Sequence, residues 1–531
     1  MIKLRILLAL VTICLAHNCI YAQKREKIRY KADELENAKV DKVKFRKLIG
    51  NVVFKQGTTT VYCDSSYFFN RENKMEAFGR VRIVDGDSVT ITSKKLIYEG
   101  NIGKARLRDD VVYRSGNRTL YTDILDYDLI LKVANFREKG RLVDDQNTLT
   151  SDNGLFFTRS DFAVFYIGVK LVAPDYTLLA DTLEYSTVTK IAVTKGNTEI
   201  ESKDGTRVKA AAGEFKTAKD QTIFEQGKIE TDDYILIARE IFLDDLNQYY
   251  RAIGDVVLTS KNDDVIIIGE EGIYDQSLGV SKIFGNPIMK KLMQKDTFFM
   301  SADTLVAIED DSVKNERILA YPKIKFFERT IQGKADSAAY FQSDSMLYLY
   351  DDPVLWNGNS QMIADSIDML FANDLIEEMQ LRKNSFLISK DTLGQFNQIK
   401  GRSMKAYFDQ SVIQAIDVNG NGESLYYALE GDSLLMGMNK IFCSNMRIRF
   451  RKGKLTNISF YKSPEAQFIP PHELSSSDTR LEGFNWRGSE RPELHDVAPY
   501  YQSITMKPGK LTTGAPINED AEAKIPDQNK N

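Results

Sequence analysis

Histidine and cysteine, which often act as catalytic bases, nucleophiles or metal ligands, are scarce in this chain of 531 residues. The histidines are His17, near the N-terminus, and His472 and His495, near the C-terminus. Because the long segment between them holds none, a Ser-His or Cys-His nucleophile system is excluded there. The sequence also contains neither a His-rich or Cys-rich metal motif nor a phosphate-binding glycine loop.

Carboxylates are the chemistry-bearing groups with a regular spacing. Fourteen positions, here called anchors, follow one another at a mean interval of about 31 residues, and eight of them hold Asp. A catalytic carboxylate is needed once or twice, and not in every repeat. We interpret the anchor Asp side chains as acceptors for backbone N–H groups at strand corners. The alternative is a ladder of metal or headgroup ligands, but other residue types at the same position disfavour it. The anchors are Asp33, Asp64, Lys94, Asp123, Asp152, Asp181, Ala211, Arg239, Glu270, Asp303, Asp336, Asp365, Arg402 and Asn439. We therefore predict a protein that is not an enzyme and needs neither a metal nor a cofactor.

The anchors belong to a longer sequence repeat. A small residue usually precedes the anchor, an aliphatic residue often follows two places later, and Phe or Tyr often stands four places later, as in residues 180–185. A second segment in each repeat has a small or turn residue near its middle, as in residues 251–256. Both segments alternate apolar and polar residues, which indicates antiparallel strands with one buried face. The sequence thus predicts an all-β, elongated array of two facing antiparallel sheets, with about 14 repeats of about 31 residues.

Composition and the two ends of the chain set the remaining limits. A hydrophobic content of 43% with 27% charged residues is typical of a folded protein, and a net charge of −4 does not favour binding to nucleic acid. Residues 1–22 have the charged start, short apolar run and small residue of a cleavable secretory signal. Residues 23–463 form the predicted array. Residues 464–531 are rich in proline and predicted to be largely irregular.

Removal of the signal would leave Cys63 and Cys443 as the cysteines of the chain. They lie twelve repeats apart, which corresponds to roughly 55–60 Å if each repeat advances a stack by one strand spacing. A disulfide needs Cα atoms within about 7 Å of each other. We therefore predict that both are free thiols.

Several segments of the repeat resemble a known family. Residues 48–57, followed by residues 60–64, are similar to the start of OstA-like domains. Residues 75–81 and 254–256 are similar to the second strand of that repeat, and residues 285–287 to its bend. OstA-like domains occur in the LptA-type periplasmic bridge of lipopolysaccharide export and in the periplasmic part of its LptD-type outer-membrane receiver. The resemblance is strongest over residues 30–190 and extends to about 460, which is long enough for two or more tandem domains.

The resemblance implies a β-jellyroll, or β-taco, whose apolar groove takes lipid A acyl chains and whose members join end to end by strand pairing. On this hypothesis the chain is a periplasmic, non-enzymatic carrier of lipopolysaccharide or a related lipid, associated with the periplasmic face of the outer membrane. Its partners would be an inner-membrane export complex, the LptD-type receiver and further copies of itself. The groove would be lined by Phe68, Val81, Leu96, Tyr98, Leu125, Tyr127, Leu183, Tyr185, Tyr274 and Tyr340.

Two alternatives remain open from the residues alone. The aromatic and aliphatic stripe can be ordinary core, with no lipid in contact with it. The whole array can also be an extracellular structural or glycan-binding β-solenoid adhesin. The alternation of two strands per repeat and the lack of an asparagine ladder favour the carrier over the solenoid.

Overall fold

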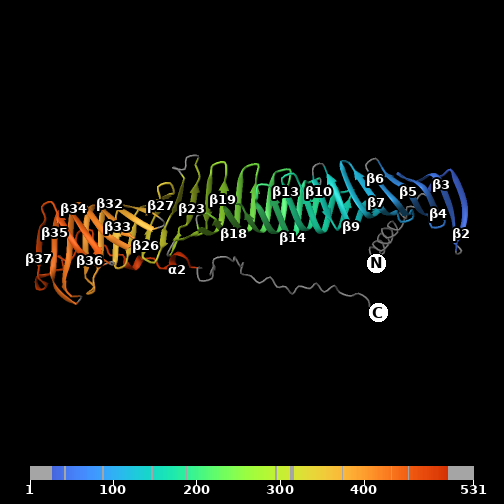
Figure 1. The fold of residues 1–531 in the computed structure, drawn as a ribbon. Coiled ribbons are helices and arrows are strands. Elements are labelled where there is room, and N and C mark those ends of the chain that lie inside the picture. The colour runs from blue at the N-terminus through green and yellow to red at the C-terminus, as the bar shows by residue number, and fades with distance from the viewer. Residues whose placement is uncertain are drawn as a thin grey trace, which may run out of the picture. The chain divides into compact units, whose positions relative to one another are not determined.

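The computed structural model describes residues 27–499, except residues 41–42, 87–88, 145–146, 187, 263, 294–295, 311–315, 373–374, 411, 432, 452–453 and 477. The predicted signal peptide and the predicted tail beyond residue 499 lie outside the described residues. Nearly all of the described chain is β-strand (Figure 1), which confirms the all-β prediction. Among the described residues, no helix has the length and apolar character needed to cross a membrane.

The chain divides into two compact units. The first unit comprises Met1–Pro287 and Thr304–Leu319, and the second comprises Ile288–Asp303 and Ala320–Asn531. The strands of the first unit are β1 (Arg29–Lys31), β2 (Glu34–Val40), β3 (Val43–Gln56), β4 (Thr59–Phe69), β5 (Lys74–Asp85), β6 (Val89–Glu99), β7 (Lys104–Ser115), β8 (Arg118–Asp128), β9 (Val133–Asp144), β10 (Asn147–Ser151), β11 (Asn153–Phe157), β12 (Phe162–Val172), β13 (Tyr176–Ser186), β14 (Ile191–Ser202), β15 (Arg207–Lys216), β16 (Gln221–Glu230), β17 (Tyr234–Asp244), β18 (Tyr249–Ser260), β19 (Val265–Asp275), β20 (Val280–Phe284) and β23 (Thr304–Ile308).

The second unit begins with shorter strands and ends with longer ones. Its elements are β21 (Ile288–Leu292), β22 (Thr297–Ser301), β25 (Ile324–Phe327), β26 (Ile331–Ala335), β27 (Ser337–Phe341), β28 (Met346–Tyr350), β29 (Val354–Asn357), β30 (Ser360–Ile363), β31 (Ser366–Ala372), β32 (Leu375–Lys390), β33 (Phe396–Asp409), β34 (Val412–Glu430), β35 (Leu434–Arg451), β36 (Lys454–Tyr461), β37 (Glu465–Ile469), η2 (Pro471–Glu473), η3 (Gly488–Glu490) and α2 (Leu494–Val497). Strand β24 (Arg317–Tyr321) contains the boundary between the units.

Most long strands of the first unit consist of two halves joined at a corner. In β5 the pairing with β6 shifts register between Phe78 and Val81, and the two residues between them, Gly79 and Arg80, have φ of +69° and +30°. A β-bulge with left-handed residues bends the strand at this point. The buried positions also change parity across the corner, as in β6, where Ile91 precedes the corner and Leu96 follows it. Both halves therefore turn an apolar face toward the same interior.

The two sets of half-strands form two facing sheets in the first unit. The ring of Phe54, from the second half of β3, lies 5.8 Å from the ring of Phe68, from the second half of β4. The hydroxyl of Tyr98 in β6 donates to Oε1 of Gln56 in β3 at 2.6 Å. Because these partners belong to different sets of paired half-strands, the contacts confirm two facing antiparallel sheets. The number of repeats stays a prediction.

Strand pairing in the second unit continues past the expected boundary at residue 464. Strand β37 pairs with β35, with Met438 opposite Ile469. The following residues contain η2, η3 and α2 and lie against the sheet, where Leu481 and Val497 are buried. The described part of the predicted tail thus packs against the second unit. Cys63 and Cys443 are free and buried, which confirms the prediction that neither forms a disulfide.

Candidate functional site

The interior of the first unit is tightly packed between β3 and β13. Phe68, Val81, Leu96, Leu125 and Tyr127 are each at most 1% exposed. Tyr98 and Leu183 are also buried, and all seven belong to one continuous core. The small hollow lined by Phe54, Met75 and Tyr98 has no room for a water molecule. These seven sequence-predicted residues therefore lie together, but as core side chains that face one another.

A buried polar cluster also crosses this part of the interior. The hydroxyl of Tyr127 donates to Oδ2 of Asp85 at 2.9 Å, and Nζ of Lys132 contacts the same oxygen at 2.5 Å. Oγ1 of Thr59 donates to Oδ1 of Asp85 at 3.1 Å. Burial, and then the negative charge of Asp85, raises the pKa of the Tyr127 phenol. The cluster ties the two sheets together, because Asp85 and Tyr127 stand in opposite sheets.

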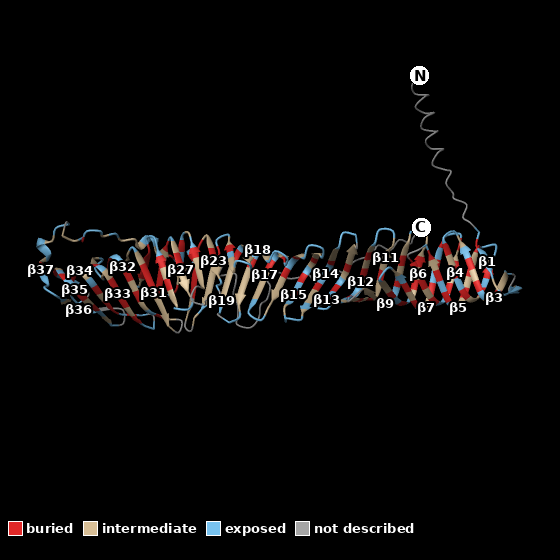
Figure 2. Cartoon of the chain, turned by 90° about the horizontal axis from the view of Figure 1, so that it is seen from above, coloured by how far each residue is buried: buried red, intermediate tan, exposed pale blue. Residues whose placement is uncertain are grey.

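From β14 to β19 many inward side chains are only half-buried, and we call the inward surface of these strands the half-buried stretch. A small core of seven residues includes Phe224 and Ile241, and partly exposed residues such as Leu236 and Leu243 pack on it. Figure 2 shows the change in β19, which is coloured mostly as intermediate. Tyr185 of β13, beside this stretch, and Tyr274 within it are half-buried.

Small residues lie together where this stretch is not filled. Gly272 stands two places after its anchor, where three other repeats have Leu96, Leu125 and Leu183. A Cβ added to Gly272 would meet no atom closer than 3.6 Å. Opposite it in the sheet lies Ala252, at the position that Leu107 takes in β7. The equally small pair Ser66 and Ala77 of β4 and β5 is fully buried, so small size alone does not leave the interior open. At Gly272 the neighbours within 4 Å of an added Cβ are Val256 and Ala252, both small, so the space beside it is not closely packed.

Two tyrosine rings flank the Ala252–Gly272 pair. Tyr250 and Tyr274 are cross-strand partners, and their rings stack with centroids 5.9 Å apart. The hydroxyl of Tyr274 donates to Oε2 of Glu309 at 3.1 Å. Burial and the nearby charge of Glu309 raise the pKa of Tyr274 to about 12, so the phenol stays neutral at physiological pH. Each ring thus offers an apolar face beside the half-buried stretch while its hydroxyl stays near a polar group.

Tyr340, the last of the predicted lining residues, belongs to the second unit. It lies in β27, is half-buried, and has its ring 6.5 Å from that of Phe371. A cavity of about 70 Å³ near this point is lined by Phe298 and Ile331 from one sheet and by Phe371 and Ile376 from the other. A cavity of this size holds water molecules but no long acyl chain.

The anchor carboxylates contact the corners of neighbouring strands. Oδ2 of Asp181 accepts the backbone N–H of Asn197 at 2.8 Å, and Oδ2 of Asp33 accepts Nδ2 of Asn51 at 2.8 Å. Asp64 accepts Nε of Arg80 at 2.9 Å. Within the described ranges, no group of three or more His, Cys, Asp or Glu is placed to hold a metal ion. Asp181 thus accepts a backbone N–H, as the sequence predicted for the anchors, whereas Asp33 and Asp64 accept side-chain donors of the corner residues.

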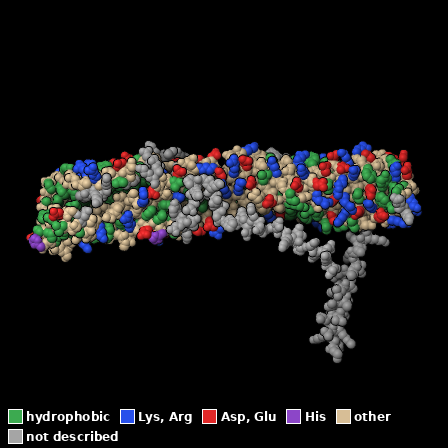
Figure 3. Space-filling model, turned by 60° about the horizontal axis from the view of Figure 1, so that its bottom comes forward, with side chains coloured by type: hydrophobic (Ala, Val, Ile, Leu, Met, Phe, Trp, Pro, Cys, Tyr) green, Lys and Arg blue, Asp and Glu red, His purple; other side chains and the backbone are tan. Residues whose placement is uncertain are grey.

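The outer surface carries mixed charges. Cross-strand pairs such as Arg137 with Asp126 and Lys195 with Glu184 join adjacent strands of the first unit. Figure 3 shows Lys and Arg interspersed with Asp and Glu over the face in view. A surface of this kind does not attract polyanions strongly, in line with the small net charge.

Sequence reasoning missed three glutamines in the second unit. Gln332, Gln361 and Gln398 are at most 2% exposed, although glutamine is usually found at the surface. The sequence contained a signal, because each glutamine stands next to an aliphatic residue in an apolar strand. There the alternation assigns every position either to the core face or to the surface face. Gln361, Gln398 and the side-chain carbonyl of Gln332 have partners in the C-terminal segment, far away in the sequence, which could not be predicted from local pattern.

Comparison with known proteins finds a family model that matches part of the chain. Residues 25–181 match the sequence model of a family described as OstA-like protein. None of the curated proteins matches the chain. Among solved structures, the chain is similar to LptH, the LptA-homologous periplasmic component of the lipopolysaccharide transport device of Pseudomonas aeruginosa. The identity is 16%, the match covers 28% of this chain and 96% of LptH, and the TM-score is 0.15. This structural likeness is too weak to bear on function.

Proposed function

We propose, on the premise that residues 25–181 form an OstA-like segment, that this protein is a non-enzymatic carrier of lipopolysaccharide or a related lipid. It works in the periplasm, takes its cargo from an inner-membrane export complex and passes it toward an LptD-type receiver in the outer membrane. An ATPase elsewhere supplies the energy. The acyl chains enter the half-buried stretch of β14–β19 and reach Tyr185 at its border in β13. The buried core residues of β3–β13 contact none of them.

The incomplete packing of β14–β19 is the observation that supports this proposal most. An acyl chain covers apolar side chains that the protein itself leaves half-exposed, such as Leu236 and Leu243. Each sheltered methylene contributes about 0.8 kcal/mol, so ten of them contribute about 8 kcal/mol before the cost of lost motion. Repeated, nearly equivalent inward surfaces also let a chain shift from one strand to the next without meeting a deep minimum.

Strand addition is the proposed mode of contact with like partners. Strand β2 pairs with β3 along one edge, and most of its side chains are exposed. A free edge offers unpaired backbone N–H and C=O groups to a strand of another copy or of a related domain. Glu34, Glu36 and Lys39 along β2 favour a partner strand with complementary charges.

Filling the interior tests the proposal. Gly272→Leu and Ala252→Leu restore the side chain that other repeats carry and occupy the space assigned to acyl carbons. We expect the purified double variant to retain less than about a tenth of the wild-type lipid, because losing two sheltered methylenes already weakens binding about tenfold. Ile273→Leu, on the opposite face of β19, conserves volume and serves as the matched control. Full lipid content in the folded double variant would overturn the proposal.

Location separates the carrier from the adhesin. Protease added to intact cells is expected to leave the chain uncut, because a periplasmic protein is shielded by the outer membrane. Digestion from outside would favour the extracellular solenoid.

A further inference from the structure

The buried glutamines of the second unit stand in one straight row. Gln332 pairs across the sheet with Trp356, Trp356 with Gln361, Gln361 with Ile388, and Ile388 with Gln398. The glutamines therefore recur on every second strand, about 9.5 Å apart. All point to one face of the sheet, which we call the glutamine face.

The glutamine face is not the face that packs against the second sheet. Ile331, next to Gln332, lines the cavity between the two sheets together with Phe371 and Ile376. Adjacent residues in a strand point to opposite faces, so Gln332 points away from that interior. The glutamine face is nevertheless as deeply buried as the interior face, as Gln361 at 0% and Met362 at 1% show.

The C-terminal strap, residues 471–476 and 478–498, covers this face. Nε2 of Gln398 donates to the carbonyl oxygen of Thr479 at 2.8 Å, and Oε1 of Gln398 accepts the N–H of Leu481 at 2.8 Å. Gln361 repeats the arrangement. Its Nε2 donates to the carbonyl oxygen of Asn485 at 2.7 Å and its Oε1 accepts the N–H of Arg487 at 2.6 Å.

Each of these two glutamines therefore uses both atoms of its side-chain amide to bind the main chain of the strap. The two strap residues that it contacts are separated by one residue. The contacts repeat at an interval of six residues along the strap. Six extended residues would span about 20 Å. The turn at Leu481–Phe484 takes up the excess over the spacing of the glutamines.

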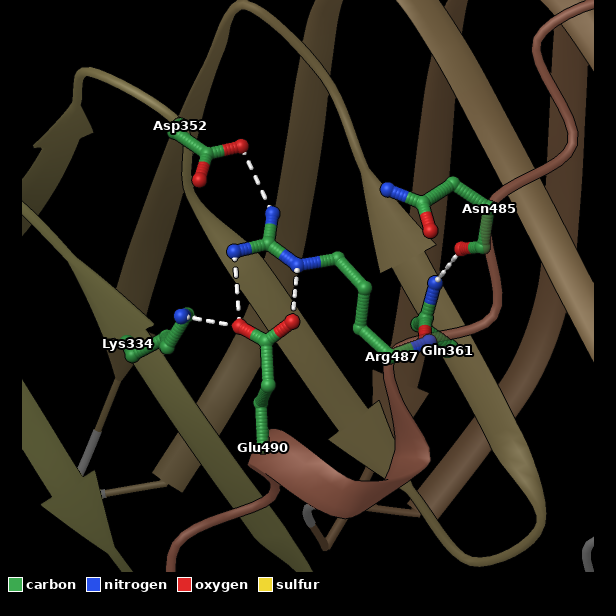
Figure 4. A network of polar contacts seen from close by, with 6 residues as sticks. All are labelled: Lys334, Asp352, Gln361, Asn485, Arg487 and Glu490. Atoms are coloured by element: carbon green, nitrogen blue, oxygen red, sulfur yellow. Dashed lines mark hydrogen bonds and ion pairs between the residues drawn. The ribbon is translucent and has the colours of Figure 1, made fainter.

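Side chains of the strap add specific contacts. Figure 4 shows Arg487 between Asp352, at 2.6 Å, and Glu490, which it contacts in a bidentate manner at 3.0 and 2.9 Å. Lys334 also contacts Glu490. Arg491 donates from Nε to Oε1 of Gln332 at 2.7 Å and from Nη1 to the carbonyl oxygen of Gly358 at 2.7 Å.

Apolar contacts complete the attachment. The rings of Phe484 and Trp486 lie 5.4 and 5.2 Å from that of Phe396. Leu481 is buried among Ile388, Leu425 and Tyr427. The strap thus contributes a buried leucine and partly buried aromatic rings together with hydrogen bonds, a combination found at specific protein interfaces.

We infer that the glutamine face is a polypeptide-binding site. It binds main chain through amides spaced two strands apart, and the strap is its resident ligand, held by these contacts and not by its covalent connection to β37. A strap of the same sequence, supplied by a second copy of this chain, is the external partner that this site fits. Acyl chains do not fit it, because lipid cannot pair with the buried amides.

A cleavable full-length chain tests the inference. A protease site is inserted after Ser476, in the exposed turn before Thr479, and the folded protein is cut and passed over a size-exclusion column at about micromolar concentration. We expect the C-terminal fragment to co-elute with the body. A labelled synthetic peptide of residues 478–499, added in excess, is expected to replace it.

Glutamine variants give the decisive comparison. Gln361→Met and Gln398→Met keep the side-chain volume but leave two strap groups without partners, so each is expected to speed fragment release at least about tenfold. Gln414→Met alters an exposed glutamine of β34 and is expected to change nothing. The uncut form of each variant shows whether it folds.

Release of the wild-type fragment on cutting would overturn the inference. Unchanged retention in a folded Gln361→Met,Gln398→Met double variant would also overturn it, and so would failure of the peptide to enter the cut wild-type chain.

Discussion

Left-handed residues at the strand corners determine where each inward side chain points. Gly50 has φ of +79° and its backbone passes so close to Asp33 that an added Cβ would lie 2.6 Å from Oδ2. Gly57, at a turn of the same region, has φ of +57°, but an added Cβ would meet nothing within 4 Å. Substitutions at these two glycines therefore distinguish the cost of a left-handed backbone from the cost of crowding at the corner.

Substituting these glycines tests the corner. Gly57→Ala is expected to cost about 1 kcal/mol of unfolding free energy, from the left-handed conformation alone. Gly50→Ala is expected to cost at least about 1 kcal/mol more, because Asp33 must also move. Thermal denaturation of both variants gives the comparison. Equal losses would show that the anchor carboxylate does not constrain the corner.

Among the elements of the first unit, β4 to β8 and β14 to β19 share one pattern but differ in packing. Leu125 in β8 is fully buried, whereas Leu236 in β17 is only partly buried against its core. The difference lies in the neighbours, since Ala252 and Gly272 replace larger residues in the second group. We therefore assign stability to β4–β8 and lipid binding to β14–β19 of the same unit.

Truncation of the two leucines tests this division. Leu125→Ala is expected to destabilise the protein by about 2–5 kcal/mol, the range for a buried leucine, with little direct effect on lipid content. Leu236→Ala is expected to cost only about 1 kcal/mol but to lower the amount of bound lipid. Unfolding curves and lipid extraction on the same preparations measure both. The assignment fails if the two variants lose stability equally and lose no lipid.

The contact between the strap and the second unit is expected to weaken in acid. Hydrogen bonds from Arg487 and then Lys334 lower the pKa of Glu490 to about 2. Because this folded-state pKa lies below the unfolded value, the carboxylate contributes stability above about pH 4.5, and the contribution is lost as the pH falls toward 2. Its size is reduced by solvent, since the Glu490 side chain is 40% exposed.

Hydrogen exchange measures this effect directly. Protection of the Arg487 amide, which Gln361 accepts, is expected to fall between about pH 5 and 2 in the wild type. In Glu490→Gln, protection starts lower at neutral pH and changes less over the same window. An identical pH profile in both proteins would exclude Glu490 as the source.

At the scale of the whole molecule, the sequence predicted the class of fold better than the place of the site. The alternation around Phe68, Leu96 and Leu125 was enough to predict facing sheets and the inward rows, because period two leaves only one side for apolar residues. Whether an inward row is filled depends on the summed volume of both sheets. The predicted lining therefore mixed buried Tyr127 with half-buried Tyr185.

Small inward-facing residues indicate where the interior is left unfilled. Gly272 and Ala252 interrupt a row that other repeats fill with leucine, and the gap becomes visible only once they are known to be cross-strand partners. The strap was not predicted, because its contacts join Gln361 and Gln398 to residues about a hundred positions away. The proline-rich composition of residues 464–531 predicted an irregular chain, which the strap largely is, but it did not indicate the surface that holds the strap.

The central claim, that lipid enters the half-buried stretch and not the packed interior, is tested most directly by photo-crosslinking from two equivalent tyrosines. Tyr127 and Tyr185 both stand four places after an anchor Asp, but Tyr127 is buried and Tyr185 is half-buried. A photo-reactive residue at each position, activated in living cells, is expected to capture lipopolysaccharide or a related lipid at 185 and none at 127. Adducts at 127, or at neither position in the folded protein, would contradict the account.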